Sequence, residues 1–254
     1  MAIDDHLRQV RTSLDAARSE LLEALKTERG RRRGALVRAL HEVNRQRDPG
    51  YRYTSQAGQD LIVDRLLSGK RGGTFVDVGG YDGVTGSNTL FLELFRGWTG
   101  VLVEPVPDQL EAARAVRRCP CLGVGVGPEA GRAEFIEVTA GYTQMSGLAA
   151  TYDATMLEAV RKDPRHAETR REIEIRTLPD LLDEAGLTAP DFVSLDIEGG
   201  EIAVLEAFPF DAYSVGIWAI ENNTNAPRIH EIMTAAGYEL AELCGPDEIY
   251  RRGA

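Results

Sequence analysis

The chain of 254 residues contains no run of 18 apolar residues, and its N-terminus lacks a basic segment followed by an apolar one. The first absence removes the signal of a transmembrane helix, and the second removes that of a secretion signal. Hydrophobic residues make up 43% of the sequence, which is enough to form a folded core. We therefore expect a soluble, cytoplasmic protein without a membrane span.

Cysteine is scarce, with only Cys119, Cys121 and Cys244 in the chain. An odd number in a chain of this length argues against a disulfide framework. The Cys119-Pro-Cys pair also lacks the second pair that a zinc or redox site of this kind would need. The apolar run Cys119–Val126 instead indicates a buried strand.

The net charge is −11, and it is unevenly distributed along the chain. Residues 1–52 contain 12 Lys and Arg against 8 Asp and Glu, so the remainder of the chain is strongly acidic. An acidic body repels phosphate backbones, which argues against a DNA or RNA partner.

The first 50 residues are expected to form a separate helical segment. Residues 5–28 repeat apolar or small side chains at heptad spacing, which predicts a helix with a narrow seam. This seam would serve either to pair subunits in a homo-oligomer or to pack back on the domain. Gly30–Gly34, with its three arginines, ends the helix; the arginines could contact nucleic acid or anionic lipid, or lie in a solvated junction. A second short helix runs to the turn Asp48–Gly50, which marks the boundary.

Residues 51–254 alternate strand-like runs with helical patterns, which predicts an α/β domain with a mainly parallel sheet covered on both faces. An antiparallel hairpin is expected near the C-terminus, and Thr139–Arg171 has the weak periodicity of an inserted lid or binding loop before the strand-like Glu172–Arg176. The expected strands of the sheet are Thr74–Val78, Gly100–Glu104, Cys119–Val126, Asp191–Asp196 and Val215–Glu221, followed by Tyr238–Leu243 and Glu248–Arg252 in the hairpin.

A glycine-rich segment, Asp77–Gly83 (DVGGYDG), follows the first expected strand. Ligands of open parallel sheets bind at the carboxyl ends of the strands, and glycine lets the backbone approach them closely. The glycine spacing differs from Gly-x-Gly-x-x-Gly, which disfavours a nicotinamide-dependent enzyme. Glu104 ends the second strand, where a carboxylate can accept hydrogen bonds from both ribose hydroxyls. Together these features favour an adenosyl ligand without a 2′-phosphate.

Five short motifs, in order along the chain, resemble the FkbM family of methyltransferases over about residues 53–252. The resemblance implies a Rossmann-like class I methyltransferase fold and the use of S-adenosylmethionine to methylate hydroxyl oxygens. Residues 1–50 lie outside it. The motifs are Ser55–Asp60 (SQAGQD), Phe75–Gly83, Ser87–Thr89, Glu104–Pro105 and Ser194–Glu201 (SLDIEGGE).

The resemblance also implies a set of cofactor-binding residues. It places Asn88 beside the methionine portion of the cofactor, and the SQAGQD segment is similar to one that closes over the cofactor, although Ser55 could instead cap a helix. Gly80 stands where the family often has alanine. The full set is Gln56, Gln59, Asp60, Asp77, Gly79, Gly80, Asp82, Gly83, Asn88, Glu104, Pro105, Gly125 and Asp196.

Oxygen-bearing side chains follow the fourth and fifth expected strands. Mg²⁺ binds through one or two carboxylates and keeps several waters, so Asp196, Glu221 and Asn222 would suffice to hold it. The arrangement is similar to that of catechol O-methyltransferase and macrolide sugar methyltransferases, in which a divalent ion would orient a diol. In the alternative, Asp196 and Glu198 cap the helix that begins near Gly199 and orient the substrate directly.

Methyl transfer to an alcohol requires in-line alignment and removal of the hydroxyl proton. Asp196 and His230 are the candidate bases, and His166 is a further residue that could touch the substrate. Tyr142 or Tyr152 is expected to line the acceptor pocket. We expect an O-methyltransferase acting on a hydroxyl of a sugar, polysaccharide or glycosylated metabolite. Its alternative is a non-catalytic adenosyl-binding scaffold whose N-terminal helices recruit a partner in glycan synthesis.

Overall fold

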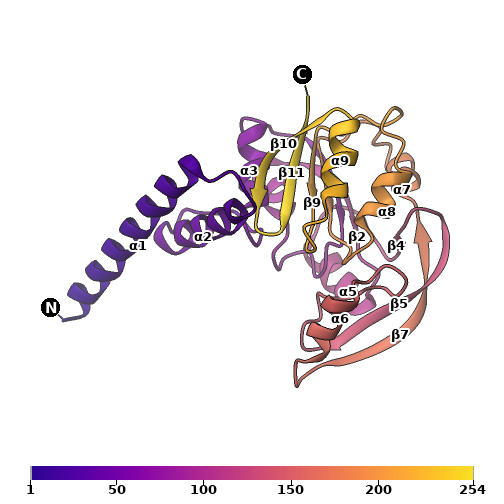
Figure 1. The fold of residues 1–254 in the computed structure, drawn as a ribbon, viewed down its shortest axis with the longest axis horizontal. Coiled ribbons are helices and arrows are strands. Elements are labelled where there is room, and N and C mark those ends of the chain that lie inside the picture. Colours follow the sequence, from indigo (N-terminus) through magenta and orange to yellow (C-terminus); the bar gives the residue numbers. More distant parts are fainter. Residues whose placement is uncertain (1, 254) are drawn as a thin grey trace.

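The computed structural model describes residues 2–253, which form an α/β domain with a helical hairpin extending from one side (Figure 1). The main sheet has seven strands in the order β10-β11-β9-β8-β1-β2-β3. Its central strands are parallel, whereas β11 is antiparallel to both β9 and β10. This confirms the expected fold class. The strands are β1 (Thr74–Val78), β2 (Thr99–Val103), β3 (Cys121–Leu122), β8 (Phe192–Leu195), β9 (Ile217–Ile220), β10 (Tyr238–Cys244) and β11 (Asp247–Arg252).

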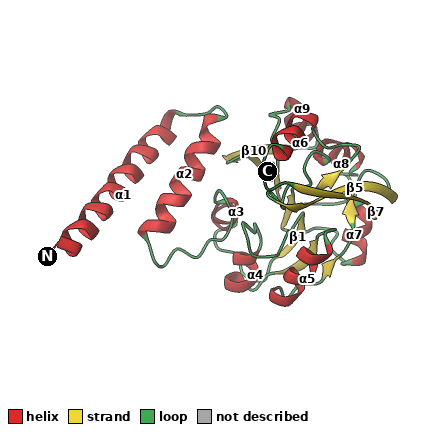
Figure 2. Cartoon of the chain, turned by 90° about the horizontal axis from the view of Figure 1, so that it is seen from below, coloured by secondary structure: helices red, strands yellow, loops and turns green. Residues whose placement is uncertain are grey.

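Helices cover both faces of this sheet (Figure 2). Every residue of β8 and β9 is buried, which is why all of them except Ser194 are apolar and the strands do not alternate in the sequence. Core contacts place α7 (Leu178–Glu184), α8 (Glu201–Ala207) and α9 (Pro227–Ala235) on one face. The other face carries α3 (Gln59–Leu66), α4 (Leu90–Arg96) and α5 (Pro107–Val116).

A second sheet of four strands, in the order β4-β7-β5-β6, lies beside the first. It refines the expectation of an inserted lid or binding loop over residues 139–171, because β5 and β7 take the two ends of that segment and pair with each other. Between them, residues 141–166 form loops, the short strand β6 and the helix α6. The strand expected at 172–176 in fact begins at residue 167. The elements are β4 (Gly125–Val126), β5 (Gly131–Ala140), β6 (Gly147–Leu148), α6 (Ala154–Arg161) and β7 (Ala167–Arg176).

The prediction of a single strand over Cys119–Val126 is wrong. The run is divided into β3 in the first sheet and β4 in the second, with Gly123 between them. The predicted burial of this run is confirmed at Cys121. All three cysteines are free thiols.

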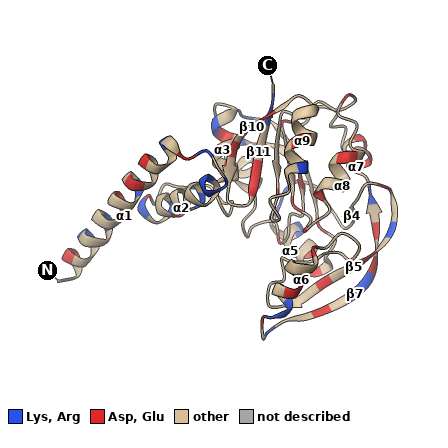
Figure 3. Cartoon of the chain, viewed as in Figure 1, with Lys and Arg blue, Asp and Glu red and all other residues tan. Residues whose placement is uncertain are grey.

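Charged residues of both signs are frequent along β5 and β7 (Figure 3). Opposite charges form diagonal ion pairs across the two strands, as in Arg132–Glu172 and Glu134–Arg170, each two residues away from the directly opposite position. Such cross-strand pairs stabilise a half-exposed hairpin. The first half of β7, residues 167–171, has charged and polar residues where an alternating strand would have apolar ones, which explains why the sequence indicated a strand only from Glu172.

The N-terminal hairpin consists of α1 (Ala2–Thr27) and α2 (Arg32–Arg47), which pack against each other. Arg18 donates to Asn44, and Arg47 pairs with Asp15 across the two helices. The seam residues nearest the turn are half-buried against α2, whereas Leu7 and Val10 stay exposed. Packing back on the protein therefore accounts for part of the heptad pattern, and pairing between subunits stays a prediction. No helix between residues 2 and 253 combines the length and apolar content of a membrane span.

Two of the three arginines at the start of α2, Arg31 and Arg33, contact the C-terminal hairpin, whereas Arg32 is exposed. Arg33 pairs with Glu242 on β10 and donates to the carbonyl of Leu25. Arg31 pairs with Glu248 on β11, its nitrogen lying 2.9 Å from the carboxylate. These contacts fix the start of α2 on the C-terminal hairpin.

Candidate cofactor and active site

A cavity of about 370 Å³ opens at the carboxyl ends of β1, β2, β8 and β9. The chain moves from β1 outward to β2 and β3 on one side, and later to β8 and β9 on the other. The cavity therefore lies at the topological switch point, where ligands of open α/β sheets bind. Its volume is that of a typical small-molecule site.

The loop after β1 passes so close to the end of β8 that only glycine fits at position 79. A Cβ on Gly79 would lie 1.7 Å from the carbonyl oxygen of Asp196, and its φ of 83° is unfavourable for other residues. A Cβ on Gly80 would lie 2.3 Å from the Leu102 side chain, which explains glycine rather than alanine there. Both glycines line the cavity.

Asp77 is buried at the floor of this loop. The hydroxyl of Thr89 donates to its carboxylate, and Arg117 lies 3.5 Å from the same oxygen. Arg117 also pairs with Glu93 at 2.7 Å, and its side chain is fully buried. Burial raises the pKa of Asp77, and the charge of Arg117 opposes that rise. Sequence reasoning missed Arg117, which follows α5 without any motif around it.

Glu104 is held between the loops that follow β1 and β2. Its carboxylate accepts one hydrogen bond from the Tyr81 backbone N–H at 3.0 Å and another from the Val106 N–H at 2.8 Å. Burial raises its pKa to about 7. Each carboxylate oxygen has a second lone pair, so the oriented group can still accept hydrogen bonds from a ligand.

Asn88 offers an unused acceptor to the cavity. Its Nδ2 donates to the hydroxyl of Ser194 at 2.9 Å. Its Oδ1 is buried, and no residue in the described chain donates to it. Buried polar atoms are normally satisfied, so this oxygen is placed to receive a donor from a ligand.

The SQAGQD segment lies at the entrance. Gln56 lines the cavity and packs over Gly86. Gln59 also lines it and donates to Asp247 at 2.9 Å. Ser55 is not the N-cap of α3, which is Gly58; its hydroxyl donates to Asp60 in the first turn of the helix and accepts from the Gly58 N–H.

Three of the expected cofactor residues do not line the cavity. Asp60 accepts hydrogen bonds from Thr54, Ser55 and Leu61. Asp82 closes its own turn by accepting from the Val84 and Thr85 amides, and Gly83 lies against α5. Their positions make them supports of the binding loops. The other ten expected residues do line the cavity, namely Gln56, Gln59, Asp77, Gly79, Gly80, Asn88, Glu104, Pro105, Gly125 and Asp196.

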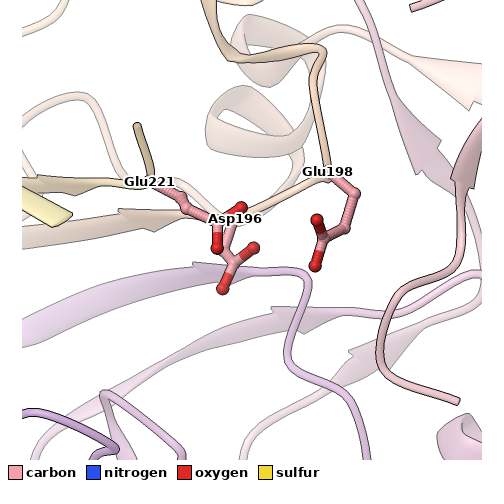
Figure 4. A group of neighbouring side chains, drawn as sticks. All are labelled: Asp196, Glu198 and Glu221. Atoms are coloured by element: carbon pink, nitrogen blue, oxygen red, sulfur yellow. The ribbon is translucent and has the colours of Figure 1, made fainter. Parts of the chain in front are cut away.

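Three carboxylates converge at the opposite end of the cavity (Figure 4). The ligand oxygens of Asp196, Glu198 and Glu221 lie within 4.8 Å of one another. Burial raises the pKa of all three groups, and nearby negative charges add to the rise, from Asp247 at Asp196 and from Asp196 at Glu198 and Glu221. Among residues 2–253, no lysine or arginine forms an ion pair with them.

The turn after β8 explains why the carboxylates of Asp196 and Glu198 do not bind the backbone N–H groups at the start of α8. The backbone N–H groups of Ile197 and Gly199 donate to the carboxylate of Glu201, and no side chain caps α8. The alternative in which Asp196 and Glu198 cap this helix is therefore wrong. Glu198 has a φ of 57°, a left-handed conformation that costs energy and recurs at functional sites.

Asn222 does not join the carboxylates. Its side-chain oxygen accepts from the Ala226 N–H at 2.7 Å, and its nitrogen donates to Glu248 at 2.8 Å. The amide is committed to the turn before α9 and does not line the cavity. The structure brings Glu198 to Asp196 and Glu221 instead.

The expected histidines lie elsewhere. His230 is exposed on α9, with its Nδ1 3.3 Å from the hydroxyl of Tyr250. His166 lies 3.0 Å from Glu168. Neither residue lines the cavity.

The insertion covers the cavity with residues other than the expected tyrosines. Tyr142 is exposed, and Tyr152 donates its hydroxyl to the carbonyl of Met145. The hydroxyls of Tyr81 and Thr143 lie 2.6 Å apart and join the insertion to the β1 loop. The sequence pointed to the segment but not to its contact residues, which are Thr143, Gln144, Met145, Ser146, Leu148 and Met156.

Comparison with solved structures finds distant similarities. The methyltransferase FkbM from Methylobacillus flagellatus KT is 16% identical, with a TM-score of 0.46 over 98% of this chain and 60% of that one. The present chain thus spans less than two thirds of that protein. A TehB-like SAM-dependent methyltransferase from Corynebacterium glutamicum ATCC 13032 Kitasato is 12% identical, with a TM-score of 0.41 over 77% of this chain and 88% of that one.

Family membership follows from the sequence itself. No curated protein matches the chain. The Methyltransferase FkbM domain, however, matches residues 77–240, which is more than half of the chain and includes the end of β1 and all of β8 and β9. The protein therefore belongs to the FkbM family of S-adenosylmethionine-dependent methyltransferases.

Proposed function

We propose that the protein is an S-adenosylmethionine-dependent O-methyltransferase that acts on a hydroxyl of a sugar, polysaccharide or glycosylated metabolite. The observation that carries the proposal is one continuous cavity, lined at one end by the β1 loop and Glu104 and at the other by three carboxylates. Such a cavity can hold a cofactor and an alcohol side by side. The acceptor class rests on the resemblance to the family.

The cofactor end matches the groups of S-adenosylmethionine. Glu104 would accept hydrogen bonds from the ribose hydroxyls, and Val106 and Phe135 supply apolar surface for the adenine. The unpaired Oδ1 of Asn88 would accept from the ammonium group. When bound, the cofactor supplies an electrophilic methyl group on its sulfonium.

At the acceptor end, the protein must hold a hydroxyl in line with that methyl group and accept its proton. We assign the base role to Asp196 rather than to His230, because Asp196 lines the cavity and His230 does not. Burial and the charge of Asp247 raise the pKa of Asp196, so its ionised form is a stronger base than an exposed aspartate.

The same three carboxylates suit a divalent cation. Mg²⁺ prefers oxygen ligands, and no basic side chain of residues 2–253 already neutralises this group. We propose that Asp196, Glu198 and Glu221 would hold the ion, with Glu198 in place of Asn222. A bound cation would orient the acceptor and lower the pKa of its hydroxyl.

The test is transfer of a labelled methyl group from S-adenosylmethionine to glycans of a cell extract, with and without Mg²⁺. We expect incorporation by the wild type and a loss of at least about 100-fold in Asp196→Asn, the usual scale for an acid–base group. Chelation by EDTA should lower the rate, and Mg²⁺ should restore it. Tight S-adenosylhomocysteine binding without any incorporation would contradict the proposed methyltransferase activity and favour a non-catalytic adenosyl-binding scaffold.

A further inference from the structure

Helix α2 carries one arginine to the edge of the cavity. Gly34 on this helix accepts a hydrogen bond from the Gly245 N–H at 3.0 Å, and a Cβ on Gly58 would lie 3.2 Å from the His41 ring. Arg38 is four residues from Gly34 and three from His41, so it shares their face of the helix. Arg38 lines the cavity together with Gln56 and Pro246, which are close in the chain to Gly58 and Gly245.

Arg38 is the single Lys or Arg that lines the cavity in the described chain. It is exposed and forms no hydrogen bond or ion pair with residues 2–253. Three other arginines of the hairpin, Arg31, Arg33 and Arg47, are paired with carboxylates. Six lining residues are acidic, namely Asp77, Glu104, Asp196, Glu198, Glu221 and Asp247.

The nearby acids do not engage this guanidinium. Asp247 accepts from Gln59, and the cation that lowers its pKa is Arg31. An unpaired guanidinium presents a planar fork of N–H donors that matches the two oxygens of a carboxylate or phosphate.

We propose that Arg38 is an anion-binding residue of the site and that its guanidinium binds a carboxylate or phosphate group of a ligand in the cavity. The anion belongs either to the methionine portion of the cofactor or to the acceptor; this inference rests on the proposed function for the identity of the cofactor. It places α2, which lies outside the matched residues 77–240, in the binding machinery.

The cofactor arm of the test is calorimetry on the full chain with two ligands. S-adenosylhomocysteine carries the carboxylate, and 5′-methylthioadenosine lacks it. If Arg38 binds the cofactor, Arg38→Gln weakens binding of the first ligand by about tenfold or more and leaves the second unchanged. Arg32→Gln is the matched control, because Arg32 is exposed and unpaired on the same helix and lies outside the cavity. Equal thermal unfolding midpoints would show that all variants fold.

The acceptor arm uses saturation-transfer NMR with glucose 6-phosphate, glucuronate and glucose. If Arg38 binds the acceptor, Arg38→Gln loses the signals of the two acidic sugars and keeps that of glucose, and Arg38→Lys restores part of the loss. The proposal is overturned if Arg38→Gln matches the wild type in both arms. A wild type that binds neither adenosyl ligand contradicts the proposed function instead, and the sugar arm then still decides the role of Arg38.

Discussion

Arg117 should be the largest single electrostatic contributor to the stability of the cofactor loop. Its side chain is 0% exposed, and those of its partners Glu93 and Asp77 are 2% and 5% exposed. Arg117→Met would leave both carboxylates buried without a cation, and loss of one partner of a buried ion pair typically costs about 3–5 kcal/mol. For a chain of this size the midpoint of thermal unfolding should fall by about 6–20 °C.

The assay is urea and thermal unfolding followed by circular dichroism at pH 7. The matched control is Arg118→Met, because Arg118 is the exposed neighbour and its substitution should change the free energy of unfolding by no more than about 0.5 kcal/mol. A loss in Arg117→Met that is no greater than in Arg118→Met would refute the reasoning.

The pH dependence of the same variant gives a second readout. Burial raises the pKa of Asp77 above its ordinary value of 3.8, and removal of Arg117 should raise it further. Between the pKa of Asp77 in the unfolded chain and its higher pKa in the folded variant, the folded variant binds more protons than the unfolded chain. Its free energy of unfolding therefore increases as the pH falls through that window. The deficit relative to the wild type should therefore shrink between pH 7 and about pH 4, and a deficit independent of pH would contradict this.

Three further predictions concern the loops of the site. Gly79→Ala, whose new methyl group would overlap the Asp196 carbonyl, should lower the free energy of unfolding by more than about 1 kcal/mol and abolish S-adenosylhomocysteine binding in calorimetry; unchanged binding would contradict it. Because the pKa of Glu104 in the empty site is about 7 and ribose hydroxyls favour its ionised form, cofactor binding should release protons between pH 6 and 7 and tighten as the pH rises. Calorimetry in buffers of different ionisation enthalpy measures that release, which Glu104→Gln should remove. Tyr81→Phe should cost about 1 kcal/mol and speed hydrogen exchange around Thr143, whose hydroxyl loses its partner; wild-type exchange would argue against this link.

The cofactor end of the site was the part most accessible to sequence reasoning. A β-branched strand that ends in glycines and a second strand that ends in Glu104 are local patterns, and parallel strands bring their carboxyl ends to one edge. The chain therefore specifies these positions without knowledge of distant contacts.

The acceptor end depended on how two short turns direct their side chains. Glu198 turns back towards Asp196 through a left-handed backbone conformation, whereas Asn222 is held by Ala226 and Glu248. Spacing along the sequence does not distinguish these outcomes. The pairing of β5 with β7 and the docking of α2 likewise depend on contacts between residues far apart in the chain.

Calorimetric titration of the full chain with S-adenosylhomocysteine tests the central claim, that the cavity at the ends of β1 and β2 binds the adenosyl cofactor through Glu104. We expect saturable binding to one site, a loss of at least about tenfold in affinity for Glu104→Gln, and no change for the exposed control Glu111→Gln on α5. Absence of binding by the folded wild type, or wild-type affinity in Glu104→Gln, would contradict the account.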